Sequence, residues 1–173
     1  MVDPNSSHAL YFDFEFVVEF SGEKLIFVCR DNLCRSPVAE AIMKNISRIK
    51  NLEIVSKGII VLFPEPYNPK ARAVLLRNNI IMENGTSDQL EESDFSEDVL
   101  IITMDRNEKQ KILEEFENPM NVYTIMEYSG GSGDIFDPYG GDTDVYTLFF
   151  ESLRTWVTQL EQKLYDEYMK EEK

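Results

Sequence analysis

Cysteine and histidine are scarce in this chain of 173 residues, which has two cysteines, Cys29 and Cys34, and one histidine, His8. Two cysteines five positions apart cannot build a disulfide framework, and a chain of this length needs none. Because His8 lies in the polar N-terminal tail, we expect neither a Cys–His or Ser–His catalytic pair nor a zinc site.

Positive charge and long apolar runs are also scarce. Seventeen Lys and Arg stand against 32 Asp and Glu, for a net charge of −15. A field of that sign repels nucleic acid and anionic lipid, so we expect neither as a partner. No apolar run approaches the ~20 residues that span a bilayer, and the N-terminus lacks the pattern of a signal peptide. These absences predict a cytoplasmic protein.

The composition that is present, 43% hydrophobic and 12% aromatic, is typical of one globular domain. We assign residues 1–9 to a disordered terminus or a cloning remnant, residues 10–22 to an additional strand and turn, and residues 23–173 to the domain. Every second position from 12 to 20 is Phe or Val. This alternation predicts a strand with one buried face.

Strand and helix patterns then alternate along the chain. Short apolar segments predict strands at 25–28, 52–56, 98–104 and 122–126. Helical patterns follow them, and the first has Ser36 and Pro37 as its expected cap and first position. The last begins near Thr143, and its polar end, 165–173, is expected to fray. The order predicts an α/β domain whose parallel sheet binds ligands at the carboxyl ends of its strands.

An anion-binding loop is predicted after the first of these strands. Its residues, called the cradle loop below, are Cys29, Arg30, Asp31, Asn32, Leu33, Cys34, Arg35 and Ser36. A turn from a buried strand into a helix directs backbone N–H groups into one concavity, and the helix dipole adds positive potential. Arg35 can hold two oxygens with its planar fork. The same field predicts a lowered pKa for the Cys29 thiol, to which Ser36 can hydrogen-bond.

The Cys–Arg spacing alone is weak evidence, because an arginine falls six residues after one of two cysteines on the order of one time in ten. Two buried structural cysteines in a tight turn are the alternative that the spacing leaves open. The preceding strand and the Ser36-Pro37 helix start favour the anion-binding interpretation.

Phosphoryl transfer also needs a proton donor, and without a core histidine a carboxylic acid is the obvious supplier. Asp137 follows the fourth strand and should reach the same sheet edge as Cys29, where its apolar neighbours can desolvate it. The alternative for Asp137 and the glycines after it is an ordinary turn.

The residues resemble the low-molecular-weight protein tyrosine phosphatases. The segment VCRDNLCRSPVAEA, followed much later by DPYGG and a long final helix, carries the resemblance from about Lys24 to Leu164. Further matches are Ser56-x-Gly58, the segment 66–71, Gln89-Leu90 and Met104-Asp105-Arg106. The resemblance implies a four-stranded parallel sheet flanked by helices, and neither a metal nor an organic cofactor.

The resemblance also implies the parts of a two-step mechanism. Cys29 would be the nucleophile, and Arg35 with the N–H groups of the cradle loop would bind the phosphoryl oxygens. Asp137 would protonate the leaving oxygen and then activate water, while Ser36 steadies the thiolate.

Other members of the cradle loop have supporting roles by the same resemblance. Asn32 would brace the loop in a left-handed conformation, with help from Ser56. Cys34 would pair reversibly with Cys29 under oxidation.

Two departures from the family pattern concern charge. Asp31 stands where the family usually has glycine, and a carboxylate there should weaken phosphate binding. Gly85 and Asp88 stand where many members carry a histidine and an arginine that brace the loop. Because both changes make the site more acidic, we expect lower phosphatase activity than is typical of the family.

The expected substrate is a phosphotyrosine-containing protein or peptide. Leu33 occupies a position that is aliphatic in tyrosine-phosphate members and threonine in arginine-phosphate members, and it suits an aromatic ring. Phe63, Tyr67 and Tyr139 are the expected walls of the pocket, although loop packing is an equal alternative for the first two.

Three functions therefore remain open: a phosphotyrosine phosphatase, a phosphoarginine phosphatase, and a catalytically weakened module that only binds phosphate. An arsenate reductase of related sequence would need cysteines outside the loop, which this chain lacks. The strand at residues 10–20 has no counterpart in short family members. We expect it to extend a sheet edge, either in its own molecule or in a partner's as a homodimer.

Overall fold

The computed structural model describes residues 20–172, so the strand expected at 10–20 lies outside the described residues except for Phe20. The strands are β1 (Lys24–Cys29), β2 (Glu53–Gly58), β3 (Val99–Thr103) and β4 (Val122–Thr124). The helices are α2 (Arg35–Ile46), α3 (Pro69–Arg77), α4 (Arg106–Glu115), α5 (Ile125–Tyr128) and α6 (Thr143–Glu171), with a 3₁₀ turn η1 (Glu92–Asp94).

The four strands form one parallel sheet in the order β2-β1-β3-β4. The predicted α/β architecture with a four-stranded parallel sheet and flanking helices is thus confirmed. Strand β1 is central because both of its neighbours pair with it, and its apolar run is buried on both faces. Leu25 and Phe27 pack on one side of the sheet, whereas Ile26 and Val28 pack on the other.

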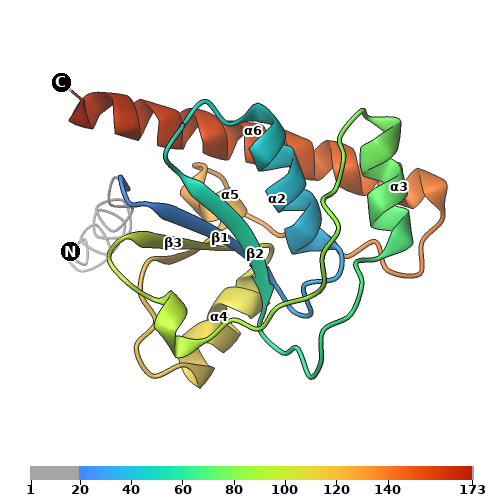
Figure 1. Ribbon diagram of the computed structural model, residues 1–173, viewed down its shortest axis with the longest axis horizontal. Coiled ribbons are helices and arrows are strands. Elements are labelled where there is room, and N and C mark those ends of the chain that lie inside the picture. The colour runs from blue at the N-terminus through green and yellow to red at the C-terminus, as the bar shows by residue number, and fades with distance from the viewer. Residues whose placement is uncertain (1–19, 173) are drawn as a thin grey trace, which may run out of the picture.

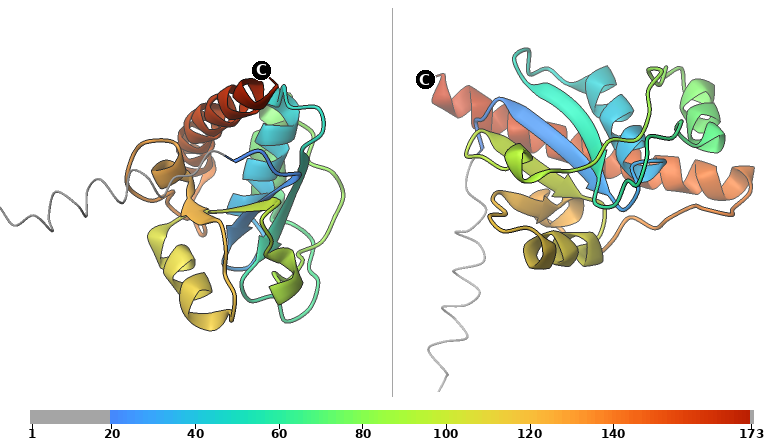
Figure 2. Two further views of the ribbon diagram at one scale, coloured as in Figure 1. Left: turned by 90° about the vertical axis from the view of Figure 1, so that its left-hand side faces the viewer. Right: turned by 60° about the horizontal axis from the view of Figure 1, so that its bottom comes forward.

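Helices cover both faces of the sheet (Figure 1). Helices α2, α3 and α6 lie together on one side, and α4 lies on the other, which the end-on view of Figure 2 shows most clearly. Because each β–α connection returns to the amino ends of the strands, all four strands end at the same edge. The loops after β1, β2, β3 and β4 therefore meet there.

Two local expectations were wrong. Helix α2 begins at Arg35 with Cys34 as its N-cap, so Ser36 lies inside the first turn and uses its hydroxyl elsewhere. The polar end of the last helix, which was expected to fray, is helical as far as Glu171. The buried carboxylate of Glu167 accepts the backbone N–H of Phe20 and the hydroxyl of Tyr128, which fastens this helix end to the body of the protein.

Candidate active site

The cradle loop turns sharply between β1 and α2, at the carboxyl edge of the sheet. Asn32 has φ 59°, the left-handed conformation expected for it. Gly58, at the end of β2, lets the loop come close: a Cβ there would lie 2.8 Å from the carbonyl carbon of Asp31 and 3.0 Å from the nitrogen of Asn32. The matched glycine thus has a steric reason, since any larger residue would push the loop away.

The amide of Asn32 is fully buried and braces the loop. Its Nδ2 donates to Ser36 Oγ and to Ser56 Oγ, both at 2.9 Å, and its Oδ1 accepts the backbone N–H of Asp88 at 2.9 Å. The left-handed residue is therefore tied to α2, to β2 and to the segment after α3. Asp88 contributes here through its backbone, so the brace does not depend on its side chain.

Cys29 ends β1, and its sulfur lies 3.0 Å from Ser36 Oγ. Burial raises the pKa of the Cys29 thiol and the negative charge of Glu108 raises it further, whereas the Ser36 hydrogen bond and the Arg35 charge act in the opposite direction. The lowered pKa predicted from the sequence is therefore wrong. Cys34 is a second buried free thiol, and burial raises its pKa as well.

Arg35 lies on the first turn of α2, and protein groups hold its guanidinium firmly. Nη1 donates to Asp105 Oδ2 at 2.9 Å and to the backbone oxygen of Ile135 at 3.0 Å. Nη2 donates to Glu108 Oε2 at 2.6 Å. Within residues 20–172 these bonds involve only the two Nη atoms, which leaves the Nε edge as the side that can face a bound oxyanion.

The side chain of Asp31 turns into the cradle loop rather than away from it. Its Oδ1 accepts the backbone N–H of Leu33 at 3.1 Å and lies 4.0 Å from Cys29 Sγ. A carboxylate oxygen therefore occupies one of the donors that an anion-binding loop would offer to a ligand. The backbone gives Asp31 no need for glycine, because the non-glycine residues with positive φ within residues 20–172 are Asn32, Asn79 and Asn121.

A cavity of about 470 Å³, called the mouth cavity below, opens over the sulfur. Its lining residues are Cys29, Arg30, Asp31, Leu33, Cys34, Arg35, Pro66, Asn68, Pro69, Asp137 and Tyr139. The loop after α5 thus brings Asp137 to the same cavity as Cys29, as the topology predicts. Asp137 itself is exposed, so the desolvation expected from its neighbours is not found. Its Oδ1 accepts the backbone N–H of Tyr139 at 3.0 Å.

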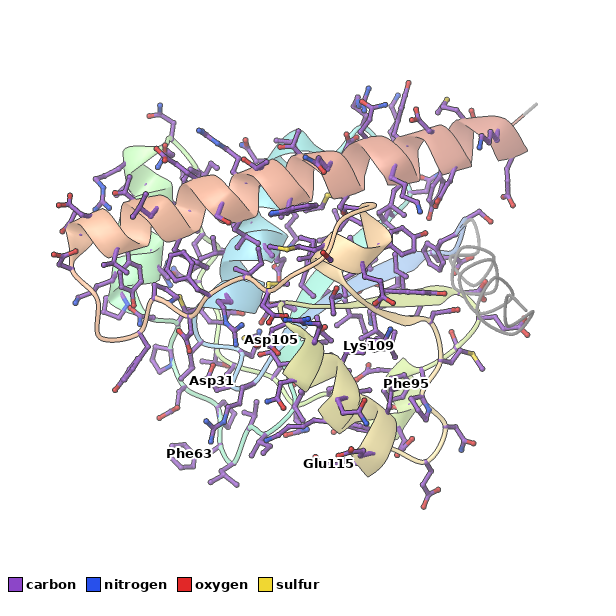
Figure 3. All side chains as sticks on the ribbon, turned by 180° about the vertical axis from the view of Figure 1, so that it is seen from behind. Asp31, Phe63, Phe95, Asp105, Lys109 and Glu115 are labelled. Carbon is purple, nitrogen blue, oxygen red and sulfur yellow. The ribbon has the colours of Figure 1, made fainter. Side chains whose placement is uncertain are left out.

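The three residues expected to form the walls of the pocket lie in different places in the structure. Tyr139 lines the mouth cavity, but Phe63 and Tyr67 do not. Phe63 is 64% exposed and projects from its loop in Figure 3, next to a neighbouring hollow that Arg30 shares. Tyr67 points the other way, where its ring packs on Gly85 and its hydroxyl bonds to Ser56. Its contacts are those of a support for the cradle loop.

Two carboxylates at this edge were not identified from the sequence as site residues. Asp105, labelled in Figure 3 where β3 passes into α4, and Glu108 bind the two Nη atoms of Arg35. They also form a capping box, in which each side chain accepts the backbone N–H of the other's residue. The spacing Asp-x-x-Glu before a helix is a signal of such a box, although it does not reveal an arginine partner.

Neither a metal cluster nor a membrane span is found in the described part of the chain. Residues 20–172 contain no group of three His, Cys, Asp or Glu side chains placed to hold a metal ion. No helix among these residues has the length and apolarity to cross a bilayer.

Comparison with known proteins agrees with this geometry. The profile of the low molecular weight phosphotyrosine protein phosphatase family matches residues 24–172. The low molecular weight protein-tyrosine-phosphatase PtpB of Staphylococcus haemolyticus is 35% identical over 130 residues, covering 75% of this chain and 91% of that protein. A protein-arginine-phosphatase of Bacillus subtilis is 35% identical over 144 residues, covering 81% of this chain and 95% of that protein.

A solved structure supports the same relationship. The low molecular weight protein tyrosine phosphatase from T. tengcongensis superimposes with a TM-score of 0.77 at 31% identity, covering 83% of this chain and 100% of that one. These relatives thus match between 75% and 83% of this chain.

Proposed function

The chain belongs to the low molecular weight phosphotyrosine protein phosphatase family, and from that membership we propose that it hydrolyses phosphotyrosine in proteins through a cysteinyl-phosphate. The observation that carries the proposal is the mouth cavity, which has Cys29 and Arg35 in its lining together with the carboxylate of Asp137. A nucleophile, an oxyanion binder and a proton donor on one cavity are what phosphoryl transfer requires.

In the first step the Cys29 thiol gives its proton to solvent, and the resulting thiolate Sγ attacks phosphorus in line with the leaving phenolic oxygen. The S–P bond forms as the P–O bond breaks, and Asp137 gives its proton to the departing oxygen. The Nε edge of Arg35 and the N–H groups of the cradle loop bind the remaining phosphoryl oxygens. Because Asp105 and Glu108 fix the Nη atoms, little further ordering of the guanidinium is needed.

In the second step Asp137 accepts a proton from water, and the oxygen of that water attacks phosphorus. The S–P bond breaks and returns its electrons to the sulfur. The hydroxyl of Ser36, 3.0 Å from that sulfur, stabilises the leaving thiolate. Asn32 positions the hydroxyl through its Nδ2 bond to Ser36 Oγ.

The test is turnover of p-nitrophenyl phosphate by three variants of the full chain. Cys29→Ser should abolish turnover, and Asp137→Ala should lower kcat by about 10²–10³-fold, because general acid catalysis is worth 10²–10⁴-fold. Asp144→Ala, an exposed carboxylate on the first turn of α6, is the matched control and should leave kcat unchanged. An inert parent protein would overturn the proposal and favour the phosphate-binding module.

Phosphoarginine is a second candidate substrate, favoured by the relative named as a protein-arginine-phosphatase and by the two carboxylates that line the mouth cavity. Asp31 and Asp137 could both face a guanidinium. Leu33 argues for tyrosine, because an apolar side chain packs on a ring and offers a guanidinium no acceptor. Peptides bearing either phosphorylated residue, assayed side by side with the parent and with Leu33→Thr, separate the two. Faster turnover of phosphoarginine by the parent would overturn the tyrosine assignment.

Location and assembly complete the proposal. We place the protein in the cytoplasm on its charge and composition, with phosphoproteins as its substrates. Homodimerisation through residues 10–20 is tested by the oligomeric state of a chain that begins at Ser21. An unchanged oligomeric state and stability would exclude any contribution of that segment to a sheet edge.

A further inference from the structure

Glu108 is the most deeply buried carboxylate of the candidate active site at the carboxyl edge of the sheet, with a side-chain exposure of 3%. Its Oε1 accepts the backbone N–H groups of Met104 and Asp105, both at 3.1 Å. Its Oε2 accepts Nη2 of Arg35 at 2.6 Å. Both oxygens are thus fixed by donors, so the carboxylate has one defined place beside the arginine.

Charged groups face Glu108 from every element around it. Arg35 comes from α2, Cys29 from the end of β1, and Asp105 from the start of α4. The two acids and the arginine also line a cavity of about 390 Å³ next to the mouth cavity. The other charged side chains on that cavity are Arg30, Lys111, Asp134 and Asp137. The chain's one histidine, His8, lies outside the described residues.

The charge of Glu108 conflicts with an oxyanion at this edge. Burial raises the pKa of Glu108 to about 7; Arg35 and the two backbone donors lower it, and Asp105 raises it. Ionised Glu108 in turn raises the pKa of the Cys29 thiol. A dianion bound by Arg35 would bring two further negative charges close to this carboxylate. A proton on Glu108 relieves the repulsion, and its oxygens keep lone pairs for the backbone and Arg35 donors.

We infer that Glu108 is a positioning residue that holds Arg35 for the oxyanion and takes up a proton when a dianionic oxyanion binds in the cradle loop. The inference rests on the proposed function, because it requires the cradle loop to bind a phosphoryl group. The balance is one proton: protein with ionised Glu108, dianion and H⁺ give the complex with neutral Glu108. Binding should therefore tighten as the pH falls through neutrality.

Sulfate is the probe, because it is a dianion at every pH from 5 to 8.5, whereas phosphate titrates in that range. The protein is the full chain carrying Cys29→Ser, which removes the reactive thiol. Calorimetric titration at constant ionic strength gives Kd at each pH. Repeating it in two buffers of different ionisation enthalpy counts the protons taken up.

We expect Kd for sulfate to rise about tenfold between pH 6 and pH 8, within the usual range of coupling between two sites. Adding Glu108→Gln should remove this dependence and the proton uptake, whatever it does to the affinity itself. Glu108→Asp keeps a titrating carboxyl and should retain the dependence with a shifted midpoint. Glu161→Gln is the matched control, because Glu161 is an equally buried helix glutamate bound to Arg48 away from the mouth cavity.

The results that overturn the inference are specific. A Kd for sulfate that does not vary with pH in the Cys29→Ser protein would overturn it. An unchanged pH dependence of Kd after Glu108→Gln is added would also overturn it, because the proton would then belong to another group. Absence of sulfate binding also overturns it. Turnover of p-nitrophenyl phosphate is measured separately with the parent protein, which keeps Cys29. If the parent is inactive but the proton coupling of sulfate binding is intact, only the proposed function is overturned.

Discussion

The two edges of the parallel sheet each hold a buried glutamate against an arginine, and the two pairs differ in how the arginine is held. At the amino edge, Glu161 accepts both Nε and Nη2 of Arg48, at 3.0 and 2.9 Å. At the carboxyl edge, Glu108 accepts a hydrogen bond from one guanidinium nitrogen of Arg35, Nη2, and Asp105 accepts one from Nη1. One carboxylate thus binds two nitrogens on one side of the Arg48 fork, whereas two carboxylates share the Nη atoms of Arg35, which also lines two cavities.

Each edge also has an asparagine in the left-handed conformation. Asn121, just before β4, has φ 55° and donates through Nδ2 to backbone oxygens of residues 96 and 99. Asn32 has φ 59° and donates to two hydroxyls, one of which contacts the sulfur of Cys29. The chain uses the same devices twice, and only at the carboxyl edge do they end on reactive atoms. Position relative to the strand ends, more than residue type, separates function from support.

The largest expected difference in activity comes from exchanging Arg35 and Arg48, one at a time, for lysine. Arg35→Lys should lower kcat/KM for p-nitrophenyl phosphate by about 10²–10³-fold, because lysine replaces a planar fork with a single point charge. Arg48→Lys should change kcat/KM by less than about twofold, since within residues 20–172 its guanidinium binds Glu161, Gln162 and the ring of Tyr165, none of which lines the mouth cavity. Steady-state kinetics of both purified variants provides the comparison.

Thermal unfolding supplies the control for these two variants. Each exchange removes part of an ion pair with a buried glutamate, so both should lower the free energy of unfolding. Equal losses of activity in the two variants would show that stability, rather than oxyanion binding, governs turnover.

A smaller effect is expected from the two asparagines. Asn32→Ala and Asn121→Ala both place an alanine at a positive φ and remove the side-chain amide that stabilises this conformation. Each change should lower the free energy of unfolding by about 1–3 kcal/mol. Only Asn32→Ala should also slow turnover, by about a hundredfold, because Ser36 then loses the donor that positions it beside Cys29. Denaturant unfolding and kcat measured on the same preparations test this, and a comparable loss of kcat in Asn121→Ala would contradict it.

Local patterns in the sequence were sufficient for the strands and for the residues of the cradle loop. Apolar runs specify β1 and β3 because a central parallel strand is buried on both faces. The order of the elements brings Asp137 and Cys29 to one cavity, since all strands end at the same edge. The left-handed Asn32 and its bond to Ser56 agree with what the family resemblance implies.

Side-chain direction and burial could not be read in the same way. Tyr67 supports the loop because Gly85 leaves room for its ring, a contact between residues 18 positions apart. The raised pKa of Cys29 arises from burial and from Glu108, which lies 79 positions away in the chain. Periodicity reports which face of an element is apolar, but it does not report which distant charge comes to lie beside a given atom.

The smallest expected effect, and the one that concerns the active edge alone, comes from Asp31. Its carboxylate takes the N–H of Leu33 and lies 4.0 Å from Cys29 Sγ, so a phosphate dianion must meet a negative charge within the cradle loop. Removing the charge with Asp31→Asn should tighten inhibition by inorganic phosphate by about fivefold, which corresponds to a partly solvated charge interaction of roughly 1 kcal/mol. Asp31→Gly should do the same and raise kcat/KM for p-nitrophenyl phosphate.

A carboxylate at the opposite edge separates this local effect from the net charge of the protein. Glu53 begins β2 and is exposed, so Glu53→Gln changes the total charge by the same amount without approaching the cradle loop. Salt screens charges that are farther apart than about 10 Å, and this control should therefore leave the inhibition constant for phosphate unchanged. If Asp31→Asn and Glu53→Gln shifted the inhibition constant for phosphate equally, the effect of Asp31 would come from the net charge of the protein and not from its place in the cradle loop. If Asp31→Gly left turnover unchanged or slower, the lower activity expected from its charge would be wrong.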